Sequence, residues 1–402
     1  MDIIIISHFC MDFSLSDNDR FLYIANELAK EHKVEVITSD FYHTEKRHRS
    51  TPVYKQWPFK ITFLHEIGYP KNICVQRFFS DYIWGKNVKK YLEKRKKPDV
   101  IYCAVPSLYG PYLTAGYCDK NNVRFIIDIQ DLWPEAFKLV FDIPVLSDLI
   151  YYPFNLLANF IYRKADSICA VSETYAECAL KSSKKCKEGI VVFLGTDLNK
   201  FDMCNVDTSY IVKGKDECWI AYCGTLGSSY DLNSVIKSLD IIKSKGWNAP
   251  KLVVMGDGPL MDKFKQQAIS LNVDCEFTGR LNYDEMCSLL KRCDITVNPI
   301  MPGAAQSIIN KHADYAASGL PVLNTQESRE YRELVEKYDM GINCKNCDAE
   351  DLANQIKFLC ENVEIRKRKG LNARRCAEEK FDRKKTYAIL VEICEKSNGM
   401  SY

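Results

Sequence analysis

The sequence has no long apolar run, no secretory signal and almost no net charge. Its 402 residues include 55 basic and 53 acidic side chains, so the chain carries +2 at neutral pH. A balanced charge provides no overall attraction for nucleic acid, and we expect no nucleic-acid partner. The apolar start Ile3–Ile6 follows the acidic Asp2 and is too short for a signal peptide. No run of about 18 apolar residues is present, and we expect no membrane-spanning helix.

The cysteine spacings of disulfide frameworks and zinc sites are also missing. Most of the 18 cysteines stand singly in apolar segments, as Cys103, Cys169 and Cys223 do, which is typical of free buried thiols. The one Cys-X-X-Cys motif, at Cys344 and Cys347, has no second pair and no histidines at metal-ligand spacing. We therefore expect no metal site and no cofactor, and a reducing cytoplasm as the location.

The first loop contains no dinucleotide-binding fingerprint. The segments Met1–Ser7 and Arg20–Glu31 predict a strand and an amphipathic helix, but the loop between them, His8–Asp19, contains no glycine. NAD-type binding is therefore not expected there. The single Asp-X-Asp motif ends at Asp19, directly before the helix, so an N-cap is a better interpretation than a ligand set for a divalent ion.

Alternating strands and helices are what the sequence does contain. Its length favours two or three domains. A strand, a helix and a second strand, Lys33–Ser39, follow one another at the start, which predicts a doubly wound α/β sheet. A polar stretch from Gly195 to Glu217 predicts the hinge, and a second series begins at Trp219. We place the two domains at 1–200 and 201–381.

Glycines recur directly after the predicted strands of the second domain. They occur at Gly224-Thr225-Leu226-Gly227, at Gly256-Asp257-Gly258-Pro259 and at Gly279-Arg280. Glycine suits positions where the backbone turns tightly or approaches a ligand. One such turn is weak evidence, but three in successive strand–helix units favour a nucleotide site in this domain.

The stretch Asn298–Gln326 carries the most specific pattern. It predicts a strand, a turn and a helix with Ser307 as N-cap. On that helix Asn310, Lys311 and Asp314 share roughly one polar face. A helix N-terminus with a lysine and an aspartate would suit a diphosphate and a ribose diol. An ordinary buried crossover with a surface Lys–Asp pair fits these residues equally well.

A basic loop follows the second predicted strand of the first domain. It places His43, Lys46 and Arg49 within eight residues of one another. Arginine and lysine bind phosphate oxygens well, so this loop is a candidate site for a phosphate-bearing acceptor. A solvated loop explains the same residues.

Two further segments of the first domain are ambiguous. Asp131 follows a predicted strand, where open α/β sheets place ligands, and for this residue a place in a cleft is favoured over a simple turn. For Trp133, packing in the core is the favoured interpretation. The aromatic-rich segment Leu146–Arg163 is too short to cross a bilayer. It predicts either a core helix or a helix that lies at a membrane interface.

Several of these motifs occur in a specific order. Through Gly224-Thr225-Leu226, Gly256–Pro259, Gly279-Arg280 and Asp314–Val322 the chain resembles the retaining glycosyltransferases of family 4, which have the GT-B fold. Arg163–Asp166 and Phe193–Asp197 look like landmarks of that family's first domain. The block Asp131–Glu135 is similar to a branch that builds bacterial surface polysaccharides. The likeness covers nearly the whole length.

The resemblance implies two Rossmann-like domains that face each other across a cleft. The acceptor would bind the first domain and the nucleotide sugar mostly the second, and a C-terminal helix, 382–402, would cross back to the first. Family members often hold the donor with two acidic residues eight apart; Asp314 matches the second, but Gln306 stands at the first. The family also has an Arg and a Lys after the first glycine turn of the nucleotide domain, where this chain has 228–230, Ser-Ser-Tyr. Lys311 would supply their charge. Gln130 stands where family members often have a histidine of the first domain near the sugar.

The reaction implied is metal-independent transfer, with retention, of a sugar from a nucleoside diphosphate to a hydroxyl of a lipid-linked or growing cell-surface glycan. UDP is the family's commonest carrier. Lys311, Gln306 and Asp131 are the candidate catalytic residues. The alternatives are a nucleotide-sugar epimerase of the same fold and a non-catalytic nucleotide-sugar-binding subunit. The candidate donor-binding residues are Gly224, Thr225, Gly256, Gly258, Arg280, Ser307, Lys311 and Asp314.

Overall fold

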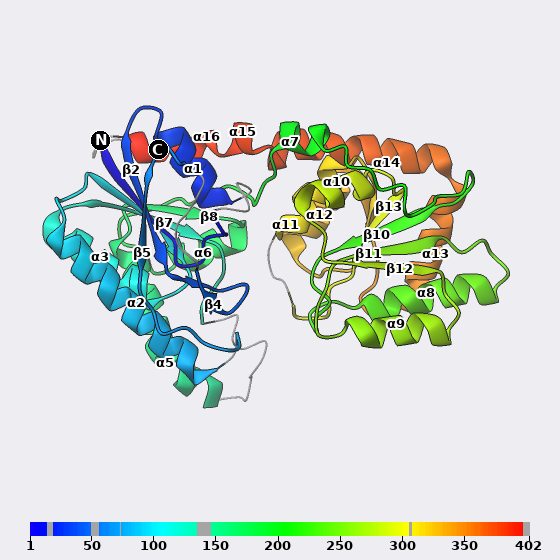
Figure 1. Ribbon diagram of the computed structural model, residues 1–402, viewed down its shortest axis with the longest axis horizontal. Helices are drawn as coiled ribbons and strands as arrows, with labels where there is room; N and C mark the ends of the chain where they lie inside the picture. The colour runs from blue at the N-terminus through cyan, green and yellow to red at the C-terminus, as the bar shows by residue number, and fades with distance from the viewer. Residues whose placement is uncertain (14–18, 50–55, 73, 135–145, 305–307, 397–402) are drawn as a thin grey trace. The chain divides into compact units, whose positions relative to one another are not determined.

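The computed structural model divides the chain into two compact units (Figure 1). It describes residues 1–13, 19–49, 56–72, 74–134, 146–304 and 308–396. Unit 1 comprises Met1–Phe193 and the C-terminal stretch from Tyr387, and unit 2 comprises Leu194–Thr386. Each unit is a Rossmann-like α/β structure with a parallel sheet, as the sequence predicts.

Unit 1 contains a seven-stranded sheet in the order β5-β2-β1-β6-β7-β8-β9, with every neighbouring pair parallel. Ile3 to Ile6 of β1 are all buried, because a central parallel strand is covered on both faces. The strands are β1 (Asp2–Ile6), β2 (Lys33–Ser39), β5 (Lys60–Leu64), β6 (Val100–Val105), β7 (Arg124–Ile129), β8 (Ser167–Ala170) and β9 (Ile190–Val191). A separate hairpin is formed by β3 (Phe41–Tyr42) and β4 (Arg47–His48).

The helices of unit 1 are α1 (Arg20–Leu28), α2 (Val75–Lys94), α3 (Tyr109–Asn121), α5 (Leu146–Lys164), α6 (Glu173–Leu180) and α16 (Ala388–Glu395). The predicted N-cap of α1 is confirmed, since the Asp19 carboxylate accepts from the N–H groups of Phe21 and Leu22 at 2.8 and 3.2 Å. Leu390 and Ile393 of α16 lie in the core of unit 1. The C-terminal helix therefore returns to the first unit, as expected.

Unit 2 contains a six-stranded parallel sheet in the order β12-β11-β10-β13-β14-β15. The strands are β10 (Trp219–Cys223), β11 (Lys251–Met255), β12 (Cys275–Gly279), β13 (Ile295–Asn298), β14 (Val322–Asn324) and β15 (Gly341–Asn343). The α-helices are α7 (Leu198–Met203), α8 (Leu232–Ser244), α9 (Met261–Ser270), α10 (Tyr283–Leu290), α11 (Asn310–Ala317), α12 (Arg329–Tyr338), α13 (Ala349–Glu361), α14 (Val363–Cys376) and α15 (Arg383–Thr386), and a short π-helix covers Ala377–Phe381.

Three local expectations differ from the structure. The helix expected from Ser307 begins at Asn310, and Ser307 and Gln306 lie outside the described residues. The single helix expected over 382–402 is divided into α15 and α16, and 397–402 lie outside the described residues. The sequence favours a solvated surface for the charged run 366–369, but Lys369 is buried and donates to the Asp339 carboxylate and the Gly341 carbonyl, because α14 packs against β15. Within the described ranges, no helix is both long and apolar enough to cross a bilayer.

Candidate functional site

The strand order of unit 2 reverses between β10 and β13. The carboxyl ends of the strands at such a reversal are where open α/β sheets bind ligands. Gly224 follows β10, and α11, which follows β13, carries Lys311. The two meet closely, since a Cβ atom built on Gly224 would lie 3.0 Å from Lys311 Nζ. The glycine therefore leaves room for the lysine amine.

The Lys311 amine is buried without a hydrogen-bond partner in the described part of the chain. The whole residue is only 9% exposed. Its Nζ lies 4.0 Å from the ring centroid of Tyr230 and 4.3 Å from that of Tyr222. Aromatic faces stabilise a cation in part. Burial nevertheless lowers the pKa of Lys311 to about 7, so an anion placed beside the amine would stabilise its charged form.

Asp314, one helical turn further along α11, has different partners. Its Oδ1 accepts a 2.9 Å hydrogen bond from the Tyr283 hydroxyl, which also lies 2.6 Å from Thr196 Oγ1. Burial raises the pKa of the Asp314 carboxyl. Among the described ion pairs none joins Lys311 to Asp314, so the ordinary surface pair is not what forms. The shared polar face is also wrong, because Lys311 is buried while Asn310 is exposed.

The glycine turns lie together at the carboxyl ends of β10, β11 and β12. Leu226 N–H donates to Asp257 O at 2.9 Å, and Gly256 and Gly279 form a bridge. A Cβ atom on Gly256 would lie 1.8 Å from Gly224 O, and one on Gly258 would lie 2.5 Å from Leu226 O. These two glycines are therefore needed for packing between the turns. Two other candidate residues for binding the nucleotide sugar, Thr225 and Arg280, are exposed at this edge of the sheet.

A buried ladder of asparagines was missed from the sequence. Asn298, Asn324 and Asn343 end β13, β14 and β15 and lie in register. Asn298 Nδ2 donates to Asn324 Oδ1, and Asn324 Nδ2 donates to Asn343 Oδ1, both at 2.9 Å. His312 contacts the ladder through Asn298 at 3.1 Å and accepts from the N–H of Ile309. The ladder thus fixes the start of α11. The sequence signal that could have indicated it is that three strands each end in Asn.

A second polar cluster lies at the strand reversal of unit 1, between β1 and β6. His8 is buried, with Nδ1 2.8 Å from Ser107 Oγ and 3.1 Å from Asp81 Oδ1, and Nε2 2.9 Å from Glu66 Oε1. Its ring stacks on Trp84 with a centroid distance of 4.0 Å. Burial alone lowers the pKa of His8, but the two carboxylates outweigh it and raise that pKa to about 9. No sequence motif indicated this cluster.

The predicted acceptor residues divide into two kinds. His43 Nδ1 lies 2.5 Å from the Tyr69 hydroxyl, and the Lys46 amine donates to the His43 carbonyl. Arg49 instead donates to the backbone carbonyls of Cys10, Met11 and Ser39. Its guanidinium therefore ties the β3–β4 hairpin to the sheet, and we leave Arg49 out of the candidate acceptor site.

Asp131 lies at the end of β7 in unit 1 and is half-buried. Its Oδ1 accepts from the Leu132 N–H at 2.9 Å. Burial raises the pKa of this carboxyl, while the Leu132 amide, the Trp133 side chain and the charge of Arg77 lower it. Trp133 is buried, as the favoured interpretation of the sequence expects.

Two side-chain groups among the described residues have the spacing of a metal site. They are Asp40, His48 and His65, and Glu31, His32 and Glu395. Both groups lie in unit 1 and neither contains a candidate donor or acceptor residue.

Residues 210–376 match the family described as "Glycosyl transferases group 1". An uncharacterized glycosyltransferase of Methanocaldococcus jannaschii, MJ1069, is 23% identical over 251 residues, which cover 62% of this chain and 63% of that protein. A second from the same organism, MJ1178, is 26% identical over 137 residues, which cover 34% of this chain and 37% of that protein. This chain thus spans less than two thirds of the length of either relative.

Solved structures are similar over nearly the whole chain. Anabaena HepE in complex with UDP and glucose has a TM-score of 0.69 at 15% identity, over 98% of this chain and 99% of that one. WaaG, a glycosyltransferase involved in lipopolysaccharide biosynthesis, has a TM-score of 0.69 at 14% identity, over 98% and 100%. The fold is therefore GT-B, and the matched domain and relatives indicate a glycosyltransferase.

Proposed function

We propose that this GT-B protein is a retaining, metal-independent hexosyltransferase. It transfers a sugar from a nucleoside diphosphate, UDP in our assignment, to a hydroxyl of a lipid-linked or growing cell-surface glycan, at the cytoplasmic face of a membrane. Unit 2 holds the donor and unit 1 the acceptor. UDP is favoured because HepE, a structural neighbour, was solved with UDP and with UDP-glucose.

The observation that carries the proposal is the unpartnered amine of Lys311 at the strand reversal of unit 2. A buried donor without a partner costs free energy, which a ligand oxygen can offset. A diphosphate provides such oxygens and also the negative charge that stabilises the ammonium form. Because Gly224 has no side chain, the Lys311 amine lies directly against the β10 turn, so a ligand bound to the amine would also be close to the backbone N–H groups of that turn.

Lys311 also suits the chemistry of the transfer. As the bond from the sugar to the diphosphate breaks, negative charge develops on the leaving phosphate, and a fixed ammonium stabilises that charge in the transition state. Asp314, oriented by Tyr283, is assigned to the ribose diol, and Asp131 to the acceptor hydroxyl. Retention would follow from attack on the face of the sugar that the phosphate leaves.

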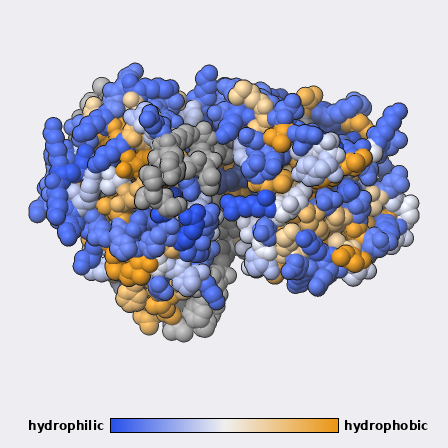
Figure 2. All heavy atoms as spheres, viewed as in Figure 1, coloured by the Kyte–Doolittle hydropathy of each residue, from blue (hydrophilic) through white to orange (hydrophobic). Residues whose placement is uncertain are grey.

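Membrane contact is supported by an apolar surface on α2 and α5 of unit 1 (Figure 2). Val75 and Phe79 of α2 are 71% and 62% exposed, and Leu149 and Tyr152 of α5 are 72% and 59% exposed. The helices lie near each other there, since the Phe78 and Phe154 rings are 5.1 Å apart. Exposed apolar and aromatic side chains of this kind suit the headgroup region of a bilayer.

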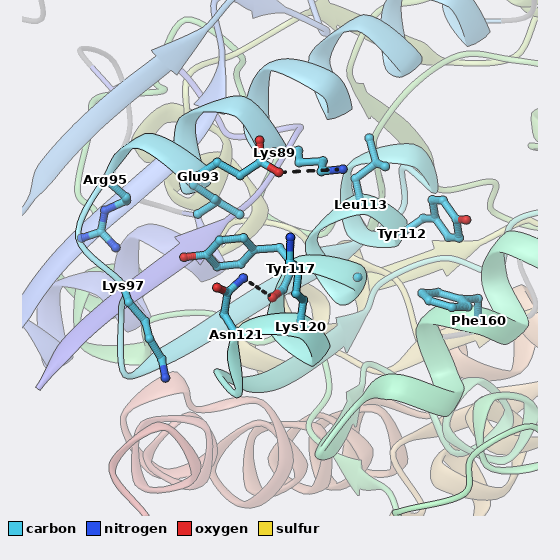
Figure 3. A pocket seen from close by; sticks show the side chains of 12 residues that line it. Lys89, Glu93, Arg95, Lys97, Tyr112, Leu113, Tyr117, Lys120, Asn121 and Phe160 are labelled. Atoms are coloured by element: carbon cyan, nitrogen blue, oxygen red, sulfur yellow. Dashed lines mark hydrogen bonds and ion pairs between the residues drawn. The ribbon is translucent and has the colours of Figure 1, made fainter.

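A groove of about 430 Å³ lies at the C-terminal end of α2, between α2, α3 and α5 (Figure 3). Its basic side chains are Lys89, Arg95, Lys97 and Lys120, and Glu93 is its single acidic one. Tyr112, Tyr117 and Phe160 form its apolar part. Basic side chains near a membrane surface attract anionic lipids.

Donor turnover by the purified protein tests the proposal. A panel of nucleoside diphosphate sugars is first screened by thermal shift, because a ligand that binds only the native state raises the Tm. We expect one to raise the Tm and to be consumed with release of its nucleoside diphosphate when a glycan acceptor is added. Sugar isomerisation without acceptor would indicate an epimerase, and binding without any turnover a non-catalytic subunit.

A further inference from the structure

Arg77 lies among aromatic rings at the carboxyl end of the unit 1 sheet. It belongs to the first turn of α2. Its guanidinium carbon is 4.6 Å from the ring centroid of Trp133, which follows β7, and 5.5 Å from those of Phe9, which follows β1, and Tyr69, which follows β5. Three segments, which follow three different strands, thus surround one cationic side chain at the sheet edge where ligands bind.

The hydrogen bonds of Arg77 leave capacity for a ligand. Nη1 donates to the Asn72 carbonyl at 2.7 Å. Nε is buried and has no partner in the described part of the chain. No ion pair within 4.0 Å joins Arg77 to a described carboxylate. A guanidinium has five N–H donors in a planar fork, which matches the oxygens of a phosphate group.

Lys46 adds a second positive charge to this place. Its Nζ lies 5.5 Å from the Tyr69 ring centroid. Burial and the charge of Arg77 lower the pKa of Lys46, and no carboxylate offsets them. His43 is affected in the same way, because burial and the charges of Lys46 and Arg77 lower its pKa to about 3. Two cations and a neutral imidazole thus share the site.

The nearby carboxylates already have partners. Glu66 and Asp81 bind the ring of His8, and Glu66 also accepts from Ser39 and Ser80. Among the described residues Asp131 is a further carboxylate near Arg77; burial raises its pKa, and the charge of Arg77 lowers it. No described carboxylate lies within ion-pair distance of Arg77 or Lys46, so both cations can still bind a phosphate group.

We infer that Arg77 and Lys46 bind a phosphate group of the acceptor, with Phe9, Tyr69 and Trp133 packing against the part of the acceptor next to that phosphate. The inference rests on the proposed function and names the acceptor class and its residues, Arg77 among them. Two sources provide this chemistry: a lipid-linked diphosphate and a soluble sugar phosphate.

Calorimetric titration in a Lys311→Met background tests the inference, because that change weakens diphosphate binding at the donor site. The probes are farnesyl diphosphate, glucose 1-phosphate and farnesol, which has no phosphate. We expect Arg77→Gln to weaken binding of the preferred phosphorylated probe at least tenfold and farnesol to bind weakly. Tighter binding of farnesyl diphosphate assigns a lipid-linked acceptor, and tighter binding of glucose 1-phosphate a soluble one.

The matched control is Arg47→Gln on the β3–β4 hairpin, because Arg47 is exposed and pairs only with Glu45 among the described carboxylates. It should bind every probe as the parent does. Should Arg77→Gln lower the Tm, Lys46→Gln provides the second variant, with at least a threefold loss expected. Unchanged affinity in correctly folded variants of both would overturn the inference. The proposed function fails separately, if the parent protein neither binds nor consumes any nucleoside diphosphate sugar.

Discussion

The amine of Lys311 lies 4.0 Å from the ring centroid of Tyr230. An aromatic face stabilises an ammonium charge less than an anion does. Tyr230 stands in the segment where the family that the chain resembles has an Arg and a Lys. The positive charge thus comes from α11, and a tyrosine lies beside it.

Lys311→Met should abolish sugar transfer and weaken binding of the nucleoside diphosphate about 10- to 100-fold. A hydrogen bond to a charged group contributes about 1.5–3 kcal/mol, which corresponds to this range. The fold should be retained, since the change removes a buried, unpartnered ammonium. Calorimetry and a Tm measurement check both points, with Lys237→Met on α8 as control. Unaltered kinetics in Lys311→Met would remove the lysine from the mechanism.

Donor affinity should fall as the pH rises above 7. The pKa of Lys311 is lowered to about 7 by burial, so in the free protein the amine loses its proton above that pH. Binding a diphosphate favours the ammonium form, which requires proton uptake at higher pH. Titrations with UDP-glucose from pH 6 to pH 9 should approach a tenfold loss per pH unit. Lys311→Arg should show no such slope, and an equal slope in that variant would contradict the assignment.

Tyr283→Phe should weaken nucleotide binding about fivefold without changing acceptor affinity. The change removes the 2.9 Å hydrogen bond to Asp314, and a neutral donor to a half-buried carboxylate is worth about 1 kcal/mol. Asp314→Ala should have the larger effect. Tyr210→Phe, an exposed tyrosine in the same unit, is the control. A change in acceptor affinity alone would refute the assignment of Asp314 to the ribose.

Unit 1 should lose stability between pH 6.5 and pH 9. The folded-state pKa of His8 is about 9, above its ordinary value of 6.5. Its contribution is therefore fully present below pH 6.5 and is lost as the pH rises through 9, up to about 3 kcal/mol. Denaturant unfolding at pH 6, 7.5 and 9.5 measures this loss. In His8→Gln the dependence over this range should largely disappear; a slope like that of the parent would exclude His8 as its source.

Replacing Phe79 and Leu149 by Ser should reduce binding to lipid vesicles about tenfold or more. Both side chains are exposed on the apolar surface of α2 and α5, and each contributes about 1–2 kcal/mol when buried in a bilayer interface. Flotation with phosphatidylglycerol vesicles measures the effect, and phosphatidylcholine vesicles separate the share of the basic groove. Ile269→Ser, a 78% exposed isoleucine of unit 2, is the control. Equal flotation of all variants would place any membrane contact elsewhere.

The N-cap at Asp19 shows what short-range sequence reasoning can predict. An aspartate directly before an amphipathic segment satisfies backbone N–H groups two and three residues away, so the helix start is a local property. The start of α11 is different. It depends on His312, which contacts Asn298 from another strand, and no local signal marked Asn310.

Arg49 and Arg77 show the same limit at the candidate acceptor site. The sequence placed Arg49 in a basic loop and did not single out Arg77. In the fold, Arg49 donates to three backbone carbonyls and has a structural role. Arg77, in contrast, has an unpartnered Nε and lies among three aromatic rings. Which hydrogen-bond capacity is already used depends on segments that only folding brings together.

The sequence by itself determined the α/β class and the two strand–helix series, and it made Lys311 and Asp314 candidate site residues, because apolar periodicity, glycine turns and helical spacing are properties of neighbouring residues. Tertiary structure alone decided that the Lys311 amine is buried against two tyrosine rings while Asp314 binds Tyr283. Burial and partner choice arise from contacts between distant segments, and these set the charge of a side chain and hence the ligand it can hold.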